Sequence, residues 1–229
     1  MSRFPTDQEA KELICDIGRR IFEKGLVAAN DGNITVKTGD NAIWATPTGV
    51  SKGYMTPEML VKLDLQGNIL KGTHKPSSEI KMHLRVFNMN PLVNACVHAH
   101  PPVATAYSVT GEWLDQPIFA EAIVMVGVVP VAEYATPGSL AVPESIAPYC
   151  LDYNCVLLAH HGALTWGTDL TQAYHRMEAL EHYAKIHMET IGLQKPARML
   201  TKAQVDELIA IRTTVNNGSL AGGIPDNRR

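Results

Sequence analysis

The sequence predicts an α/β fold, as a three-layer α/β/α single domain with a mostly antiparallel or mixed central sheet. Segments with helical periodicity are mixed along the chain with short β-type runs, and two of these runs flank a hairpin-like connection. The 229 residues, 45% of them apolar, are enough to bury a substantial core between layers. No Gly/Ser-rich, Pro-rich or single-charge linker divides the chain, so we expect one domain over residues 1–215 and a flexible tail over residues 216–229.

The first part of the chain predicts a helix followed by short strands. Thr6 and Glu9 have the spacing of a capping box, and apolar residues then recur at helical spacing until Gly25. Thr56-Pro57 indicates a short helix, because proline suits the first helical position. The expected strands, bounded by residues common in turns, are 34–36, 43–45, 61–63 and 68–70.

The rest of the chain alternates helices with apolar strands. Glu79 falls in the first turn of an expected helix, where a carboxylate interacts favourably with the amide dipoles. We expect helices beginning at Ser77, at Pro101, at Thr168 with an end near Gly192, and at Thr201 with an end near Ile211. The expected strands are 93–97, 128–131 and 156–159.

Two of these strands end at histidines. Side chains two positions apart in an extended chain point the same way, so the imidazoles of His98 and His100 can reach one ion. A second apolar strand stops at the pair His160-His161. A third imidazole from that pair would complete a catalytic zinc site with an open position for substrate.

Three short polar segments accompany the histidines and predict an anion site. Each of them alone is typical of a turn or a helix cap. Together, their backbone amides and hydroxyls are the usual donors for a phosphate that is held without a Walker lysine loop. Glu79 directly follows Ser77-Ser78, so a phosphate bound there would place its ester near a carboxylate. The segments are 30–33, 46–49 and 76–79.

Composition argues against several other classes of protein. The net charge of -3, without a basic run, argues against a nucleic-acid partner, and no apolar run approaches membrane-spanning length. The start of the sequence lacks the apolar region of a signal peptide, so we expect a cytoplasmic location. The cysteines form no Cys-x-x-Cys pair and are interpreted as buried thiols; they are Cys15, Cys96, Cys150 and Cys155.

In these motifs the sequence resembles the class II sugar-phosphate aldolases of the fuculose-1-phosphate aldolase type, with the related ribulose-phosphate 4-epimerases and adducin head domains. The resemblance covers roughly residues 13–208, and a set of ordered motifs is far more specific than one His-x-His. The motifs are Gly32-Asn33, Thr46-Pro47-Thr48-Gly49, Pro76-Ser77-Ser78-Glu79, His98-Ala99-His100 and His160-His161-Gly162.

The resemblance implies a metal-dependent aldolase that cleaves a ketose 1-phosphate into dihydroxyacetone phosphate and an aldehyde, through an enediolate that the metal stabilises. It implies Zn²⁺, with Mn²⁺ or Co²⁺ as alternatives, and Glu79 as the acid/base. It also implies a homotetramer with its sites at subunit contacts. The implied metal ligands are His98, His100 and His161, and the implied phosphate-binding residues are Asn33, Thr48, Gly49, Ser77 and Ser78.

Some residues depart from the family pattern. The position of a tyrosine that helps to protonate the leaving alkoxide is occupied by Phe119, and no aromatic residue follows Tyr183 to replace a C-terminal tyrosine. The candidates for the missing proton donor are Tyr107, Tyr134 or a residue from a neighbouring subunit, although we interpret both tyrosines as core residues. Asp31 would repel a phosphate, so we expect it to point away or to contact Lys52.

The remaining histidines are interpreted as structural or surface residues. Strand alternation is expected to turn His160 to the face opposite its neighbour. Glu181, on the longest expected helix, is expected at an interface or behind the site. The other histidines, on helical patterns or in a charged loop, are His74, His83, His175, His182 and His187.

Several alternative functions remain open. A sugar-phosphate 4-epimerase would share the metal, but that branch has an aspartate where this chain has Glu79. A phosphorylated sugar-acid decarboxylase, or an enzyme acting on methylthioribulose phosphate, would use the same scaffold. A metal-free module like the adducin head is disfavoured, because the histidines and Glu79 are all present. A cupin is disfavoured because no glutamate follows shortly after His100.

Overall fold

The computed structural model describes residues 4–216 and 221–223 and contains one eight-stranded sheet in the order β4-β3-β2-β1-β5-β8-β7-β6. All neighbouring strands pair antiparallel except β6 and β7, which are parallel, so the mixed α/β sheet predicted from the sequence is confirmed. The strands are β1 (Asn33–Gly39), β2 (Ala42–Ala45), β3 (Val61–Leu63), β4 (Ile69–Lys71), β5 (Ala95–Ala99), β6 (Val131–Ala132), β7 (Cys155–Leu158) and β8 (Gly162–Gly167).

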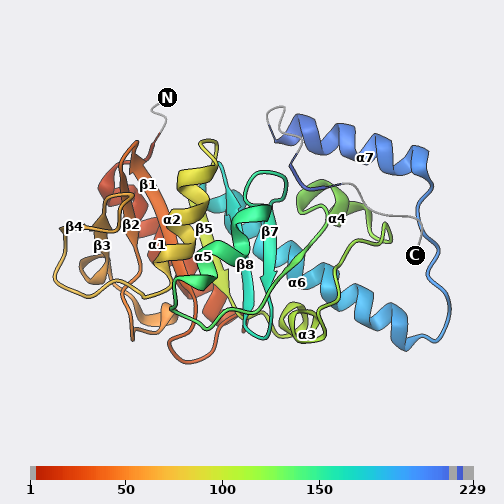
Figure 1. Cartoon of the computed structure of the whole chain (residues 1–229), viewed down its shortest axis with the longest axis horizontal. Helices are drawn as coiled ribbons and strands as arrows, with labels where there is room; N and C mark the ends of the chain where they lie inside the picture. The colour runs from red at the N-terminus through yellow and green to blue at the C-terminus, as the bar shows by residue number, and fades with distance from the viewer. Residues whose placement is uncertain (1–3, 217–220, 224–229) are drawn as a thin grey trace.

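Helices cover both faces of the sheet, which gives three layers (Figure 1). Buried residues of α1, α3 and α6 pack in one core, and those of α2 and α5 pack in a second core on the opposite face. The α-helices are α1 (Asp7–Glu23), α2 (Ile80–Met89), α3 (Pro102–Thr110), α4 (Ala120–Met125), α5 (Ala141–Ile146), α6 (Leu170–Gly192) and α7 (Lys202–Val215); the short 3₁₀ turns are η1 (Lys52–Tyr54), η2 (Pro57–Met59) and η3 (Ala147–Tyr149).

The helix starts follow the capping signals in the sequence. The Thr6 hydroxyl accepts from the Glu9 amide while the Glu9 carboxylate accepts from the Thr6 amide, and Thr201 with Gln204 repeats this capping box at α7. Asp169 caps α6 by accepting from the Gln172 amide. Each such cap satisfies amides that the first helical turn leaves without a partner, and stabilises its helix by about 1 kcal/mol.

Three elements escape the sequence pattern, and one is shorter than expected. β8 is bracketed by glycines, which ordinarily indicate turns, although all six of its residues are buried. α4 and α5 contain only six residues each, too few to show a helical period. The strand expected at 128–131 is reduced to Val131–Ala132, because Val129 forms an isolated bridge with Leu114 instead.

The end of the described chain packs against the domain. In the segment expected to be a flexible tail, Asn216 is buried, the Gly222 carbonyl accepts from the Val128 amide, and the Gly222 amide donates to Asp152. The rest of that segment lies outside the described residues. None of the helices in the described ranges combines the length and the apolar character needed to cross a membrane.

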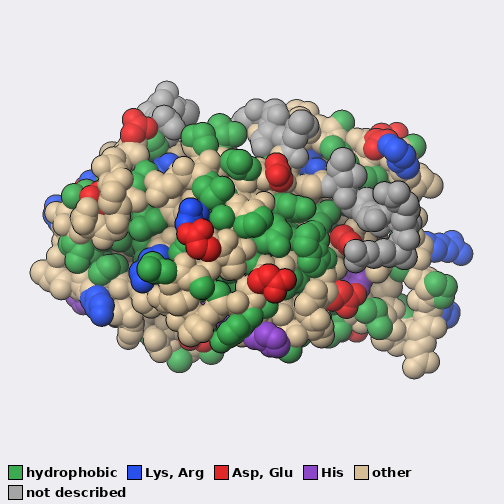
Figure 2. Space-filling view, viewed as in Figure 1, with side chains coloured by type: hydrophobic (Ala, Val, Ile, Leu, Met, Phe, Trp, Pro, Cys, Tyr) green, Lys and Arg blue, Asp and Glu red, His purple; other side chains and the backbone are tan. Residues whose placement is uncertain are grey.

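Charged side chains are dispersed over the face that carries α2 and α5. In the view of Figure 2, lysine and arginine side chains lie singly and are separated by apolar and uncharged polar atoms. A salt bridge on this layer joins Arg85 of α2 to Glu144 of α5. The described residues in this view therefore show their lysine and arginine side chains spread out, without a gathered basic patch.

Candidate metal centre

Antiparallel pairing brings the polar segments to one edge of the sheet, which is formed by the ends of its central strands and not by an edge strand. Asn33, the first residue of β1, pairs with His98 near the end of β5, and Ala45, the last residue of β2, pairs with Thr35. The turn between β7 and β8 lies at the same edge, because Ala163 near the start of β8 pairs with Ala99 at the end of β5. Strand starts and strand ends alternate along such an edge, so segments far apart in the sequence meet there.

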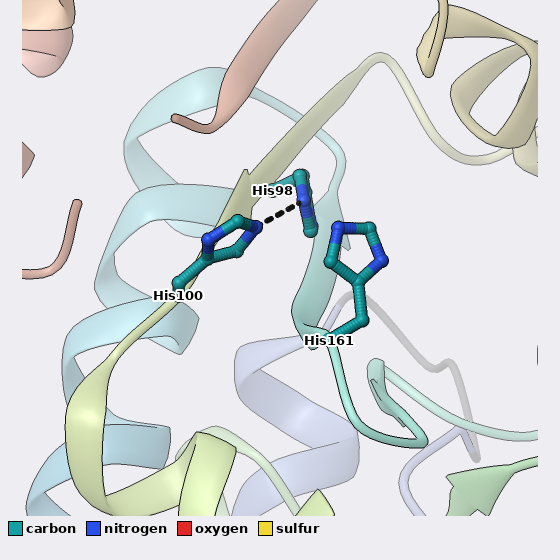
Figure 3. A group of neighbouring side chains, drawn as sticks. All are labelled: His98, His100 and His161. Atoms are coloured by element: carbon teal, nitrogen blue, oxygen red, sulfur yellow. Dashed lines mark hydrogen bonds between the residues drawn. The ribbon is translucent and has the colours of Figure 1, made fainter. Parts of the chain in front are cut away.

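Three imidazoles converge at this edge. His98 and His100 come from β5 and the residue after it, and His161 comes from the β7–β8 turn; their rings face one another (Figure 3). The ligand atoms that they offer all lie within 4.8 Å of one another, and Nε2 of His98 is 3.1 Å from Nε2 of His100. Two nitrogens bound to one tetrahedral zinc lie roughly 3.3 Å apart, so the spacing fits a single ion.

The surroundings of these rings prepare them as neutral ligands. Nδ1 of His98 lies 2.9 Å from the Ala163 carbonyl oxygen, which can only accept, so Nδ1 carries the proton and Nε2 presents its lone pair to the centre. Burial holds the pKa of His98 well below its ordinary value and also lowers the pKa of His100. The donor set of three imidazoles is common at catalytic zinc sites, so the residues present fit a divalent metal ion.

The turn that carries His161 needs an unusual backbone. His160 has φ 57°, in the left-handed region, and lies in a turn with its side chain exposed. Its side chain does point away from the cluster, but the turn causes this and not the strand alternation that we expected. Next to His161, a Cβ on Gly162 would lie 2.6 Å from both the Ala99 carbonyl oxygen and the His100 ring. Glycine at 162 is therefore required for His100 to reach the cluster.

The carboxylate of Glu79 lies among the same nitrogens. Its Oε1 is 3.0 Å from Nε2 of His161 and its Oε2 is 3.5 Å from Nε2 of His98. Burial by itself would raise the pKa of Glu79, but the hydrogen bond from His161 and the charges of the histidines lower it to about 2. Glu79 directly precedes α2, but its side chain makes no capping hydrogen bond to the helix. Its carboxylate contacts the histidines instead.

Beside the histidines lies a polar cavity of about 210 Å³. Two segments form its wall as an antiparallel pair: the Thr48 amide donates to the Lys75 carbonyl at 3.0 Å and the Ser77 amide donates to the Thr46 carbonyl at 3.3 Å. Of the predicted phosphate-binding residues, four line the cavity together with Glu79 and His100; they are Thr48, Gly49, Ser77 and Ser78.

The fifth predicted phosphate-binding residue, Asn33, stands behind the cavity wall. Its amide nitrogen donates to Glu79 Oε2 at 2.9 Å and lies 3.4 Å from the Ser77 hydroxyl, while its own oxygen is buried without a hydrogen-bond partner. The geometry makes Asn33 a residue that orients Glu79 and Ser77.

Asp31 differs from both alternatives expected for it. Its carboxylate lines the cavity, and its Oδ2 lies 3.3 Å from Nδ1 of His100. It neither points away nor bonds to Lys52, whose ammonium donates to the carbonyls of Asn30 and Val50. The reason is local, because the loop before Gly32 turns the carboxylate toward the imidazole, whose Nδ1 proton it can accept.

The tyrosines considered as proton donors occupy different environments. Tyr107 is buried and its hydroxyl lies 2.6 Å from Nδ1 of His187, so its interpretation as a core residue is confirmed. Tyr134 is 60% exposed, with its ring 6.2 Å from that of His160, so the same interpretation is wrong for Tyr134. Phe119 packs against His182 with 5.7 Å between the rings.

Glu181 has a role that its sequence neighbourhood does not reveal. Its two carboxylate oxygens accept from the amides of Val103 and Ala104, at 3.0 and 2.8 Å, at the start of α3. α3 begins two residues after His100, so Glu181 fixes the chain next to a predicted ligand. The partners are 78 and 77 residues away along the chain, and only the tertiary structure brings them together.

The other histidines stay apart from the cluster. His83 is fully buried, accepts or donates one hydrogen bond with Thr35 at 2.8 Å, and has a pKa lowered to about 3 by burial. His175 and His182 are exposed on α6. Within the described part of the chain, only His98, His100 and His161 group as metal ligands.

Comparisons with known proteins agree on one family. The Class II Aldolase and Adducin N-terminal domain matches residues 12–188. A 3-oxo-tetronate 4-phosphate decarboxylase of Haemophilus influenzae is 36% identical over 208 residues, 89% of this chain and 97% of that protein. An L-fuculose phosphate aldolase of Methanococcus maripaludis is 36% identical over 171 residues, 75% of this chain and 92% of that protein. A solved L-fuculose 1-phosphate aldolase structure has a TM-score of 0.82 at 28% identity, covering 91% of this chain and 97% of that one.

Proposed function

Because the chain belongs to the class II aldolase and adducin family, whose members act on sugar phosphates, we propose that it is a metal-dependent carbon–carbon lyase for a small phosphorylated sugar derivative. One observation carries the proposal: three inward-facing imidazoles, a carboxylate and a polar cavity meet at one edge of the sheet. Such a site combines a Lewis acid, an acid/base group and an anion anchor.

Within this class we propose decarboxylation of a 3-oxo sugar acid phosphate as the reaction. Loss of CO₂ from such an acid leaves a carbanion equivalent that needs one proton at carbon. Aldol cleavage must also move a proton on the oxygen of the aldehyde half. Phe119 cannot supply that second group and Tyr107 is buried against His187, which leaves the exposed Tyr134 as the remaining candidate named from the sequence within this chain. The decarboxylase relative, matched over 97% of its length, supports the same choice.

The second candidate is aldol cleavage of a ketose 1-phosphate. The L-fuculose phosphate aldolase relative and the solved aldolase structure favour it, since both match most of the chain. The two reactions share a step in which a bond beside a carbonyl breaks and its electrons are held until a proton arrives. They differ in the group that leaves, which is CO₂ in one case and an aldehyde in the other, and in the second proton that only aldol cleavage moves.

In the proposed mechanism each side chain has a local task. His98, His100 and His161 would hold a divalent ion, Zn²⁺ with Mn²⁺ or Co²⁺ as alternatives, which supplies Lewis-acid stabilisation of the developing negative charge. Glu79 is ionised because its pKa is about 2, and it passes a proton from water to the carbon that loses its substituent. Four residues bind the phosphate and Asn33 holds Ser77 and Glu79 in place; the four are Thr48, Gly49, Ser77 and Ser78. The homotetramer, with its sites at subunit contacts, and the cytoplasmic location stay predictions.

A product assay tests the proposal and separates the candidates. The metal-loaded protein is incubated with 3-oxo-tetronate 4-phosphate and, separately, with a panel of ketose 1-phosphates, and dihydroxyacetone phosphate, CO₂ and aldehyde are each measured. We expect dihydroxyacetone phosphate with an equal amount of CO₂. Equal amounts of dihydroxyacetone phosphate and aldehyde would identify the aldolase instead. Absence of dihydroxyacetone phosphate from every substrate would contradict both lyase reactions.

A further inference from the structure

The polar cavity contains one cation that the functional motifs do not explain. Among the described residues that line it, Lys52 is the only lysine or arginine, whereas Asp31 and Glu79 contribute negative charge. Its side chain belongs to the first residue of η1 and is 1% exposed. A lysine so fully buried is rare and calls for a counter-charge or a function.

The hydrogen bonds of Lys52 tie together the two loops of the cavity. Its ammonium donates to the Asn30 carbonyl at 2.8 Å and to the Val50 carbonyl at 2.6 Å. Asn30 precedes Gly32-Asn33, and Val50 follows Thr48-Gly49, so the ammonium holds both predicted phosphate loops at a fixed separation. An ammonium has three N–H donors, and two carbonyls leave one donor for the cavity.

Both hydrogen-bond acceptors of the Lys52 ammonium within residues 4–216 and 221–223 are neutral carbonyls, so no carboxylate of those residues accepts from it. Burial lowers the pKa of Lys52 to about 8, although the charges of Asp31 and Glu79 act to raise it. The face of α1 against η1 contributes Gly18 and Phe22, which carry no charge. A dianion entering the cavity would supply the missing negative charge.

We propose that Lys52 is the cationic donor of the phosphate site and that it makes the cavity select a phosphate dianion over an uncharged group. The inference rests on the proposed function, which places a phosphate in this cavity, and adds the residue that sets its charge preference. The hydroxyls and amides of the cavity wall orient the oxygens of the phosphate. Lys52 adds a charged hydrogen bond to the phosphate and fixes the spacing of the two loops.

Binding of methyl phosphate, a phosphate ester without a sugar, tests this assignment without any turnover. Its affinity for the metal-loaded wild-type protein and for Lys52→Gln is measured by calorimetry at pH 7, where a phosphate monoester is mainly a dianion. Glutamine keeps a donor for the loop carbonyls but removes the charge. We expect a loss of roughly 10- to 100-fold in affinity, because a charged hydrogen bond disappears. Lys71→Met, which removes an exposed lysine of β4 that does not line the cavity, should stay within about twofold of wild type.

The pH dependence of binding gives a second readout in the unmodified protein. The ammonium is charged below a pKa of about 8, so the wild-type affinity should be level from pH 7 to about 8 and then fall by up to roughly tenfold per pH unit. Lys52→Gln should show no such fall. A Lys52→Gln protein that retains its metal and binds methyl phosphate within twofold of wild type would overturn the assignment.

The two proposals fail in different ways. Methyl phosphate binding that depends on Lys52, in a protein that releases neither CO₂ nor aldehyde, supports the role of Lys52 and contradicts the proposed reaction. A wild-type protein that binds no methyl phosphate at millimolar concentration contradicts the phosphate site itself, and the assignment of Lys52 with it.

Discussion

The carboxylate of Glu79 is held by contacts on both of its oxygens. Asn33 donates to Oε2, and Nε2 of His161 lies 3.0 Å from Oε1. These contacts hold the carboxylate beside the position where the three rings would bind the ion, and therefore beside a substrate bound to that ion. A carboxylate fixed in this way can pass a proton from water to one carbon in each turnover, which is what the proposed reaction requires.

Replacement of Glu79 by glutamine should separate chemistry from metal binding. Glutamine has the same shape and keeps one acceptor, so Glu79→Gln should bind the metal as wild type does. It cannot transfer a proton, and we expect kcat to fall by roughly 10²- to 10⁴-fold. Metal analysis together with steady-state kinetics checks both expectations. Full turnover in this variant would refute the role of Glu79 as the acid/base.

Side-chain positions could be predicted where spacing alone decides them. The alternation of side chains in an extended strand predicts that His98 and His100 point the same way, and their Nε2 atoms lie 3.1 Å apart. Spacing could not reveal that Asp31 would contact His100 or that His160 would adopt φ 57°. Both depend on loop backbones whose course is set by distant neighbours.

The start of α3 shows how one element fixes another close to the site. The carboxylate of Glu181 in α6 accepts hydrogen bonds from the amides of Val103 and Ala104, which follow His100 shortly after the end of β5. Amides at a helix start lack partners within the helix, and a carboxylate there is favourable to them and to the helix dipole. α6 therefore braces the segment that presents His100.

Glutamine at position 181 should loosen this brace. It loses the charge and one of two acceptors, so we expect Glu181→Gln to lower the free energy of unfolding by about 0.5–2 kcal/mol. The dissociation constant for zinc should rise by about 10-fold, as is typical when the support of a ligand is removed. Chemical unfolding and zinc titration measure the two effects. Glu189→Gln, at an exposed position of the same helix, is the control, and equal effects in both variants would contradict the bracing role.

Elements with strong local signals could be predicted from the sequence. The capping boxes at Thr6 and Thr201 mark the starts of α1 and α7, and the long periodic run marks α6. The signal fails for β8, whose glycines satisfy close packing against neighbouring strands and the first turn of α6 instead of forming turns. Close approach of this kind is a tertiary requirement, so the local sequence cannot distinguish it from a turn.

The C-terminal part of the molecule is joined to the domain through a buried guanidinium. Arg212 of α7 is 1% exposed and donates to the carbonyls of Ile123, Gly222 and Gly223. These acceptors belong to α4 and to the segment after α7, so one side chain links three parts of the chain. Burial lowers the pKa of Arg212, which reflects the cost of keeping its charge away from water.

Removal of this guanidinium should destabilise the fold without changing the site. Arg212→Met leaves buried carbonyls without partners, and we expect the free energy of unfolding to fall by about 1–3 kcal/mol, or the melting temperature by about 2–10 °C. Arg198→Met, which replaces an exposed arginine, should change the free energy by less than about 0.5 kcal/mol. Thermal unfolding followed by circular dichroism compares the two. Equal stability of both variants would show that the buried hydrogen bonds of Arg212 contribute nothing.

Zinc content after equilibrium dialysis tests most directly whether the three distant imidazoles act as one site. Wild-type protein and His160→Ala should each retain one ion per chain, because the exposed His160 is outside the cluster. His161→Ala should retain far less at the same free zinc concentration, because two imidazoles cannot replace three. One tightly bound ion per chain in His161→Ala, or none in the wild-type protein, would contradict the proposed metal centre.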